Sequence, residues 1–221
     1  EREHLRELFG RHVGTEVARH AIDNTRLGGE TREVSVLFVD LRGSTALAQS
    51  LPPERLVAML NDLFTAVVAA VEAEGGWANK FEGDAALCIF GAPLPQPGHA
   101  EHALRAARQL AADLEQLRRR HPDLDAGIGV ATGTVVAGNI GSAQRYEYTV
   151  IGDAVNVAAR LCALAKRSPG RVLVDAPSVE AAGAAEKAVW ERCGEVQLKG
   201  REGTAITYAP VQSSRMAAQV S

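Results

Sequence analysis

The chain has 221 residues, 46% of them apolar, which is enough to build one substantial buried core. Its formal net charge of −3 provides no broad basic surface, so nucleic acid is not expected as a partner. Three cysteines without CxxC spacing argue against a disulfide framework or a zinc site and favour a reducing, cytoplasmic setting.

The first 28 residues predict an amphipathic helix followed by a break. Apolar residues recur at three- and four-residue steps through residues 3–22, and NTRLGGETRE then interrupts the pattern. Because the chain begins at Glu1 in charged, helix-forming sequence, we expect a domain taken from a longer protein with a regulatory or membrane module upstream. Residues 1–28 then form a linker that either packs on its own domain or carries a signal from that module.

A mostly apolar, valine-rich run, EVSVLFVD, predicts that residues 33–40 form a strand covered on both faces. Two helices are expected next. Ser44 and Thr45 can cap the first, through ALAQSL, and Pro53 suits the first turn of the second. The longest apolar stretch, residues 63–71, is far shorter than the roughly 20 residues that span a membrane.

Two strand-like runs, GWANKF and AALCIFG, flank only Glu82, Gly83 and Asp84, which predicts a β-hairpin. A helix is expected from His99 to about Arg120, because its apolar residues keep to one face. DAGIGVATG and TVVAGNIG then predict two further strands. The order βααββαβ is a ferredoxin-like α+β plan, an α/β sandwich whose antiparallel-rich sheet is backed by helices.

Later elements are appended to this core. They are a helix in DAVNVAARLCALAK, a strand RVLVD, and a final strand pair, EVQLKG and AITYAP. Residues 212–221 are expected to form a flexible tail. The predicted division is therefore a linker at 1–28, one compact domain at 29–211, and the tail.

Asp40 and Asp84 each stand where a strand meets a turn, and they share one small volume if the first strand lies beside the hairpin. Crowded carboxylates repel one another unless cations join them. Mg²⁺ is commonly held by one or two carboxylates with substrate phosphates, and two such ions can activate an attacking oxygen while stabilising a leaving one. Each aspartate alone is more typical of a cap or turn, but the two together favour a metal site.

LRGST, immediately after Asp40, has the composition of a small phosphate cradle. Gly43, Ser44 and Thr45 at a helix start leave backbone N–H groups free for an anion, and the helix dipole adds to the attraction. The segment is not a P-loop, because GxxxxGK[ST] is absent.

YEYTVIGDAVNVAARL contains a third cluster, in which Asn156 and Arg160 stand four residues apart on one helix face. An asparagine and an arginine presented together can donate to a sugar oxygen and to charge developing on a phosphorus. Taken alone, the two residues are explained as well by a local hydrogen bond and a surface ion pair.

FVDLRGST, NKFEGDAALCIFG and YTVIGDAVNVAAR, in that order and at these separations, resemble motifs of the class III nucleotidyl cyclases, catalytic domains that make cyclic AMP or cyclic GMP. The resemblance covers roughly residues 33–209. It implies an adenylate cyclase that converts ATP to 3′,5′-cyclic AMP and pyrophosphate with two Mg²⁺ or Mn²⁺ ions per active site. Such a domain is the output of a signal-transduction protein.

The same resemblance implies where the metals and the triphosphate bind. The residues it implies for the metal site are Asp40, Leu41 and Asp84. The triphosphate lies along the residues that follow, Arg42, Gly43, Ser44 and Thr45. Lys199, in the variable loop LKGREG, is a weaker match for a cation at the terminal phosphates.

The resemblance also implies how the nucleoside is read. Asn156 corresponds to the residue that orients the ribose, Arg160 to the one that stabilises the transition state, and Lys80 to the base-selecting lysine. Thr149 occupies a second base-selecting position, where many adenylyl cyclases have Asp and some bacterial members have Thr; guanylyl cyclases typically pair Glu with Cys. Because a hydroxyl can accept a hydrogen bond from the adenine amino group, Lys80 with Thr149 favours ATP, with looser rejection of GTP than a carboxylate gives.

By the same resemblance, the family works as a dimer. One subunit brings the metal aspartates and the other brings Lys80, Asn156 and Arg160, so a homodimer contains two equivalent shared sites. GSAQRY, residues 141–146, is short where other members have a longer arm that reaches the partner subunit.

Other functions fit these residues less well. A diguanylate cyclase and a polymerase palm both share a ferredoxin-like core and two-metal chemistry. A diguanylate cyclase, however, carries a GG[DE]EF-type turn where this hairpin reads FEGDAA. A polymerase palm has no need of VNVAAR. A catalytically silent nucleotide-binding dimer that only relays signals usually lacks a metal aspartate or the Asn–Arg pair, and all of these are present. A guanylate cyclase is the remaining alternative.

Overall fold

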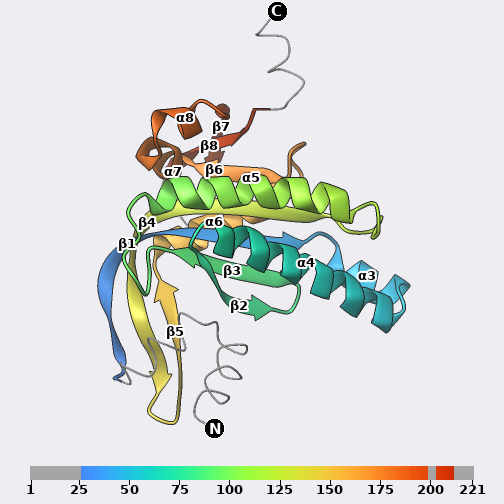
Figure 1. The fold of residues 1–221 in the computed structure, drawn as a ribbon, viewed down its shortest axis with the longest axis horizontal. Helices are drawn as coiled ribbons and strands as arrows, with labels where there is room; N and C mark the ends of the chain where they lie inside the picture. Colours follow the sequence, from blue (N-terminus) through green and yellow to red (C-terminus); the bar gives the residue numbers. More distant parts are fainter. Residues whose placement is uncertain (1–25, 199–202, 212–221) are drawn as a thin grey trace, which may run out of the picture.

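The computed structural model describes residues 26–198 and 203–211 (Figure 1). The predicted helix at residues 3–22, the phosphate-site candidate Lys199 and the predicted tail at 212–221 lie outside the described residues.

The described residues form an eight-stranded sheet in the order β2-β3-β1-β4-β6-β8-β7, with β5 paired to β4. Every pair is antiparallel except β4 with β6. This confirms the predicted ferredoxin-like α+β plan with appended C-terminal strands. The strands are β1 (Gly28–Leu41), β2 (Trp77–Glu82), β3 (Ala85–Phe90), β4 (Ala126–Ser142), β5 (Arg145–Ile151), β6 (Val172–Asp175), β7 (Trp190–Gln197) and β8 (Thr204–Pro210).

Helices cover both faces of the sheet, so the core has two layers. Buried residues of α4 and α5 pack on one face, and those of α6 pack on the other. Figure 1 shows α4 and α5 in front of the strands and α6 behind them. The helices are α3 (Ser44–Ser50), α4 (Pro53–Ala73), α5 (His99–Leu117), α6 (Asp153–Ala165), α7 (Ala176–Ala181) and α8 (Ala184–Lys187).

Two glycines of β4 let α6 lie directly on the sheet. A Cβ added at Gly129 would come within 2.1 Å of the Ala158 carbonyl oxygen, and one at Gly127 within 2.4 Å of the Cys162 carbonyl oxygen. Any side chain there would push the helix away. These glycines therefore fix the position of α6, which carries Asn156 and Arg160.

The structure corrects two local predictions. DAGIGVATG and TVVAGNIG form one continuous strand, β4, because β1 pairs with it residue by residue through Thr132, Gly133 and Thr134, the glycine-containing step at which the sequence predicts a break. Ser44 and Thr45 do not cap α3. Its N-cap is Gly43, in the left-handed conformation at φ 71°, without a capping hydrogen bond from any side chain.

The helix α4 also differs from what its sequence predicts. By length and composition alone it could cross a membrane, which the stretch at residues 63–71 did not suggest. One face of α4 is buried and packs in the core, as is usual for an amphipathic helix that covers a sheet. The buried residues of that face include Met59, Leu63, Val67 and Val71.

The hairpin β4–β5, together with the start of β1, extends beyond the helices as an arm (Figure 1). Gly28 of β1 pairs with Asn139 of β4, and Gly138 of β4 pairs with Thr149 of β5. Thr149, a predicted base-selecting residue, is thus held in a continuous antiparallel ladder.

Candidate functional site

Asp40 and Asp84 lie side by side where β1 ends and β3 begins. Asp40 pairs in register with Ala85, the first residue of β3, and the Leu41 amide donates to the Asp84 carbonyl oxygen at 3.3 Å. Gly83, at φ 64°, makes the tight turn before Asp84. Burial raises the pKa of Asp40, and the nearby Asp84 carboxylate raises it further.

Lys166, immediately after α6, occupies the space beside the two aspartates. Its Nζ lies 2.5 Å from Oδ2 of Asp40, and its side chain is only 20% exposed. This ion pair lowers the pKa of Asp40, in opposition to burial and Asp84. Asp40 thus already binds a cation supplied by the chain itself.

The glycine-containing loop after Asp40 leads directly into α3. Gly43 and Thr45 are exposed and Ser44 is half-buried, while Leu41 is buried in the core. A Cβ at Gly43 would meet nothing within 4 Å, so the glycine serves the backbone turn rather than a close contact. Because no side chain caps α3, the N–H groups of its first turn have no side-chain acceptor.

Arg42 is tied to Asp125, the residue immediately before β4. The Arg42 amide donates to the Asp125 carbonyl oxygen at 2.6 Å, and its guanidinium donates to the Asp125 carboxylate at 3.2 Å. Arg171 donates to the same carboxylate through two nitrogens, and Arg118 through one. Asp125 therefore anchors the loop to the body of the domain.

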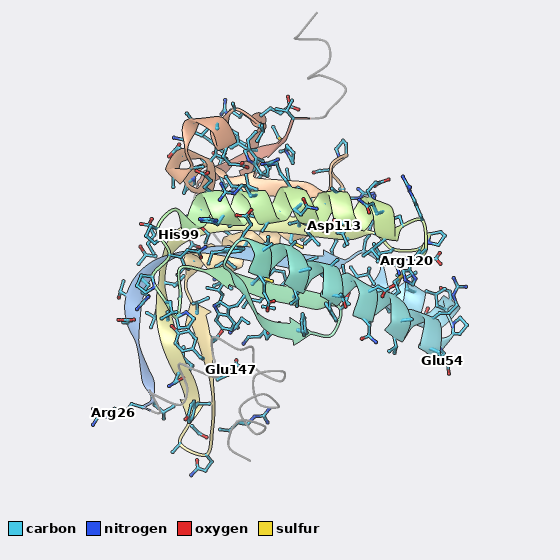
Figure 2. All side chains as sticks on the ribbon, viewed as in Figure 1. Arg26, Glu54, His99, Asp113, Arg120 and Glu147 are labelled. Atoms are coloured by element: carbon cyan, nitrogen blue, oxygen red, sulfur yellow. The ribbon has the colours of Figure 1, made fainter. Side chains whose placement is uncertain are left out.

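Lys80 and Thr149 lie on β2 and β5, two strands that are not paired in the sheet but whose side chains meet. Lys80, on β2, forms an ion pair with Glu147 of β5. Thr149 is buried, and its Oγ1 lies 3.0 Å from Oδ1 of Asn79. Glu147 is labelled on the arm in Figure 2.

Asn156 and Arg160 lie on α6, four residues apart as predicted. Asn156 is exposed and Arg160 is half-buried. The side chain of neither residue forms a hydrogen bond or ion pair within the described part of the chain. Asn156 is ten residues from Lys166, or about 15 Å along a helix axis. It therefore lies well away from the end of α6 that contacts Asp40.

The structure thus brings the candidate residues together in two groups. Asp40, Asp84 and the loop at 41–45 form one group, and Lys80 with Thr149 forms the other. Two residues of these groups, Glu147 and Lys166, were not predicted from the sequence. Strand alternation places Glu147 on the same face as Thr149 and could have identified it, whereas nothing in the local pattern links Lys166 to a residue 126 positions earlier.

The donor set at Asp40 and Asp84 suits a hard divalent cation. Two carboxylates meet there, and an ammonium already stands in as the cation. Within residues 26–198 and 203–211, no group of three or more His, Cys, Asp or Glu side chains is arranged to hold a metal. A metal at this site would therefore share its coordination with backbone, water or substrate oxygens.

Comparison with known proteins identifies similar chains. A family model described as the adenylate and guanylate cyclase catalytic domain matches residues 29–211. An uncharacterized protein of Mycobacterium tuberculosis is 50% identical over 212 residues, which are 96% of this chain and 39% of that protein. The chain thus spans about two fifths of the length of this curated relative.

Two solved structures share the fold. The crystal structure of the guanylyl cyclase Cya2 matches with a TM-score of 0.74 and 31% identity, over 85% of this chain and 96% of that one. The adenylyl cyclase CyaB from P. aeruginosa matches with a TM-score of 0.75 and 27% identity, over 85% of this chain and 97% of that one. Cyclases for both nucleotides are therefore similar to this chain.

Proposed function

The chain belongs to the family of adenylate and guanylate cyclase catalytic domains, and on that premise we propose that it is an adenylate cyclase. The reaction is conversion of ATP to 3′,5′-cyclic AMP and pyrophosphate. The observation that carries the proposal is the convergence of Asp40 and Asp84 beside the uncapped start of α3. One place thereby offers carboxylates for a metal and backbone N–H groups for phosphates.

The choice of ATP rests on this chain's own residues, because cyclases for both nucleotides are among its structural relatives. Lys80 lies on β2 and Thr149 on β5, and each is held by a side chain of the other strand. A threonine hydroxyl can accept a hydrogen bond from the 6-amino group of adenine. Guanine has no donor at that position, which favours ATP over GTP.

In the proposed reaction, the ribose 3′ oxygen attacks the α-phosphorus, the new O–P bond closes the ring, and the bond from the α-phosphorus to the bridging oxygen breaks. Asp40 and Asp84, with Leu41, would hold two divalent cations, Mg²⁺ or Mn²⁺. Such ions would supply a lowered pKa for the 3′ hydroxyl and positive charge for the pyrophosphate. Asn156 orients the ribose. Arg160 offsets the charge that develops on the α-phosphate.

The triphosphate is assigned to the loop that follows Asp40. Its backbone N–H groups at Gly43, Ser44 and Thr45 face the phosphates, and Asp125 restrains Arg42 at the base of the loop. Lys199 is assigned to the terminal phosphates on the sequence resemblance alone.

The complete site is proposed to form between two copies of the chain. Asn156 and Arg160 have no described partner within one chain, and Asn156 lies about 15 Å along α6 from the end that meets Asp40. In a two-fold homodimer, the aspartates of one protomer meet Lys80, Asn156 and Arg160 of the other, which gives two equivalent sites. Residues 1–28 are proposed to link this output domain to an upstream regulatory module.

A product assay tests the proposal. The purified protein is incubated with Mn²⁺ or Mg²⁺ and with ATP or GTP in parallel, and cyclic products are separated from linear nucleotides. Metal-dependent cyclic AMP formed faster than cyclic GMP is the expected result. Faster cyclic GMP formation would identify a guanylate cyclase, and no cyclic product from folded, dimeric protein would identify a silent relay module.

A further inference from the structure

The strand β2 contains a β-bulge at Asn79, next to the base-selecting candidate Lys80. Ala78 pairs with Cys88 of β3, and Lys80 pairs with Leu87, so Asn79 is the extra residue in the ladder. In a regular strand, the side chains of neighbouring residues point to opposite faces. Here the side chains of both Asn79 and Lys80 contact β5, because the bulge turns one of them toward the face of the other.

The contacts of Asn79 fix which way its amide group faces. Its Nδ2 lies 2.7 Å from the backbone carbonyl oxygen of Tyr148, and that oxygen can only accept a hydrogen bond. The amide nitrogen must therefore face Tyr148, which leaves the amide oxygen, Oδ1, facing Thr149. That oxygen is also only an acceptor.

The hydroxyl of Thr149 must therefore donate its hydrogen to Asn79. Its Oγ1 lies 3.0 Å from Oδ1 of Asn79, and the one hydroxyl hydrogen must lie between the two oxygens. Only the lone pairs of Oγ1 remain for a ligand. Because Thr149 is 6% exposed, few water molecules compete to reverse this arrangement.

We propose that Asn79 is a specificity-determining positioning residue, which fixes Thr149 as a hydrogen-bond acceptor and thereby selects a 6-aminopurine over a 6-oxopurine nucleotide. This inference rests on the proposed adenylate cyclase activity. The 6-amino group of adenine is a donor and matches the acceptor, whereas the 6-oxo group of guanine is itself an acceptor. Without Asn79, the threonine hydroxyl is free to rotate, so it can accept from adenine or donate to guanine.

The test is the ratio of kcat/KM for ATP to kcat/KM for GTP. In Asn79→Ala this ratio should fall by about tenfold, the effect of about one hydrogen bond, mainly through faster use of GTP. Purine riboside triphosphate, which has only hydrogen at C6, should be used at the wild-type rate. That third substrate distinguishes lost selectivity from general damage to the site.

A double-mutant cycle supplies the matched control. Thr149→Val removes the hydroxyl whose direction Asn79 sets, so adding Asn79→Ala to Thr149→Val should leave the ratio unchanged. If Asn79→Ala does not fold, Asn79→Leu, which has a similar shape, takes its place.

The outcomes separate this inference from the activity on which it rests. A wild-type protein that prefers GTP, or that makes no cyclic nucleotide, overturns the proposed function itself. A wild-type preference for ATP that persists unchanged in Asn79→Ala overturns only the role of Asn79. That role is also overturned if the ratio falls as far in the Thr149→Val background as in the wild type.

Discussion

Lys166 Nζ lies 2.5 Å from Oδ2 of Asp40, so a carboxylate proposed to bind metal carries an ion pair with the protein's own ammonium group. A divalent cation would have to compete with this group for Asp40. The pair lies at the junction of β1 and the end of α6, which links the proposed metal site to the helix that carries Asn156 and Arg160.

Replacing Lys166 should strengthen metal binding. In Lys166→Met, Asp40 loses its internal counter-ion. Mn²⁺ should therefore bind without nucleotide about two- to fivefold more tightly, the scale of a partly exposed ion pair. Titration of free Mn²⁺ by electron paramagnetic resonance measures this affinity. Lys187→Met, which makes the same charge change at an exposed residue of α8, is the control. Equal affinities in the two variants would mean that Lys166 does not compete with the metal.

Asp84 should be required for turnover and dispensable for folding. Asp84→Asn removes a proposed metal ligand, so cyclic nucleotide formation should be abolished. The same change removes a charge that raises the pKa of Asp40, so the metal-free melting temperature should stay the same or rise. Thermal unfolding with excess chelator measures the second effect. Retained kcat in a correctly folded Asp84→Asn protein would refute the metal assignment.

Arg160 should act mainly in the transition state. Arg160→Ala should lower kcat by about 100-fold or more, with a much smaller change in KM, because charge on the α-phosphate develops only during the reaction. The fold of the variant should be unaffected, since the Arg160 side chain has no hydrogen bond or ion pair with another described residue. Steady-state kinetics and circular dichroism test both points. An unchanged kcat would remove Arg160 from the proposed mechanism.

Asp125 should contribute stability that depends on pH. Burial favours its protonated form, but hydrogen bonds from Arg171 and Arg42 outweigh burial and hold the pKa of Asp125 below its usual value. The folded protein therefore binds fewer protons here than the unfolded chain. The stabilising effect is present above the unfolded pKa of about 4 and is lost as pH falls through the folded pKa.

The variant Asp125→Asn tests this pH dependence. Urea unfolding at pH 7 should show a loss of about 1–3 kcal/mol relative to the wild type, the scale of a broken charged hydrogen bond. The difference should shrink in acid, where the wild-type carboxylate also becomes protonated. A difference that is the same at pH 7 and at pH 3 would show that Asp125 stabilises the fold by some means other than its charge.

The sequence predicted the fold wherever a local pattern decides it. Three such patterns each correspond to an element of the structure: the valine-rich apolar run before Asp40, the short turn at Gly83, and the helical spacing in α4 and α5. The single strand β4 could not be predicted, because its continuity depends on pairing with β1 across a glycine. Propensity alone predicts a break at that glycine.

The candidate site likewise contains residues that could be predicted from the sequence and residues that could not. Asp40, Asp84, Lys80 and Asn156 stand out because motifs surround them. Their partners on distant segments do not: Lys166 reaches Asp40 through the packing of α6 on Gly127 and Gly129, and Asn79 reaches Thr149 through a bulge. Contacts that depend on how distant elements pack cannot be predicted from a local stretch of sequence.

The most direct test of the shared metal-dependent site is complementation between two inactive proteins, Asp40→Ala and Arg160→Ala, assayed for cyclic AMP from ATP and metal. In a random mixture half of the dimers are mixed, and each mixed dimer has one intact site of two, so about a quarter of the wild-type activity should return. Differently tagged subunits, purified through both tags, confirm that mixed dimers form. No cyclic AMP from confirmed mixed dimers would contradict a metal-dependent site shared between two chains.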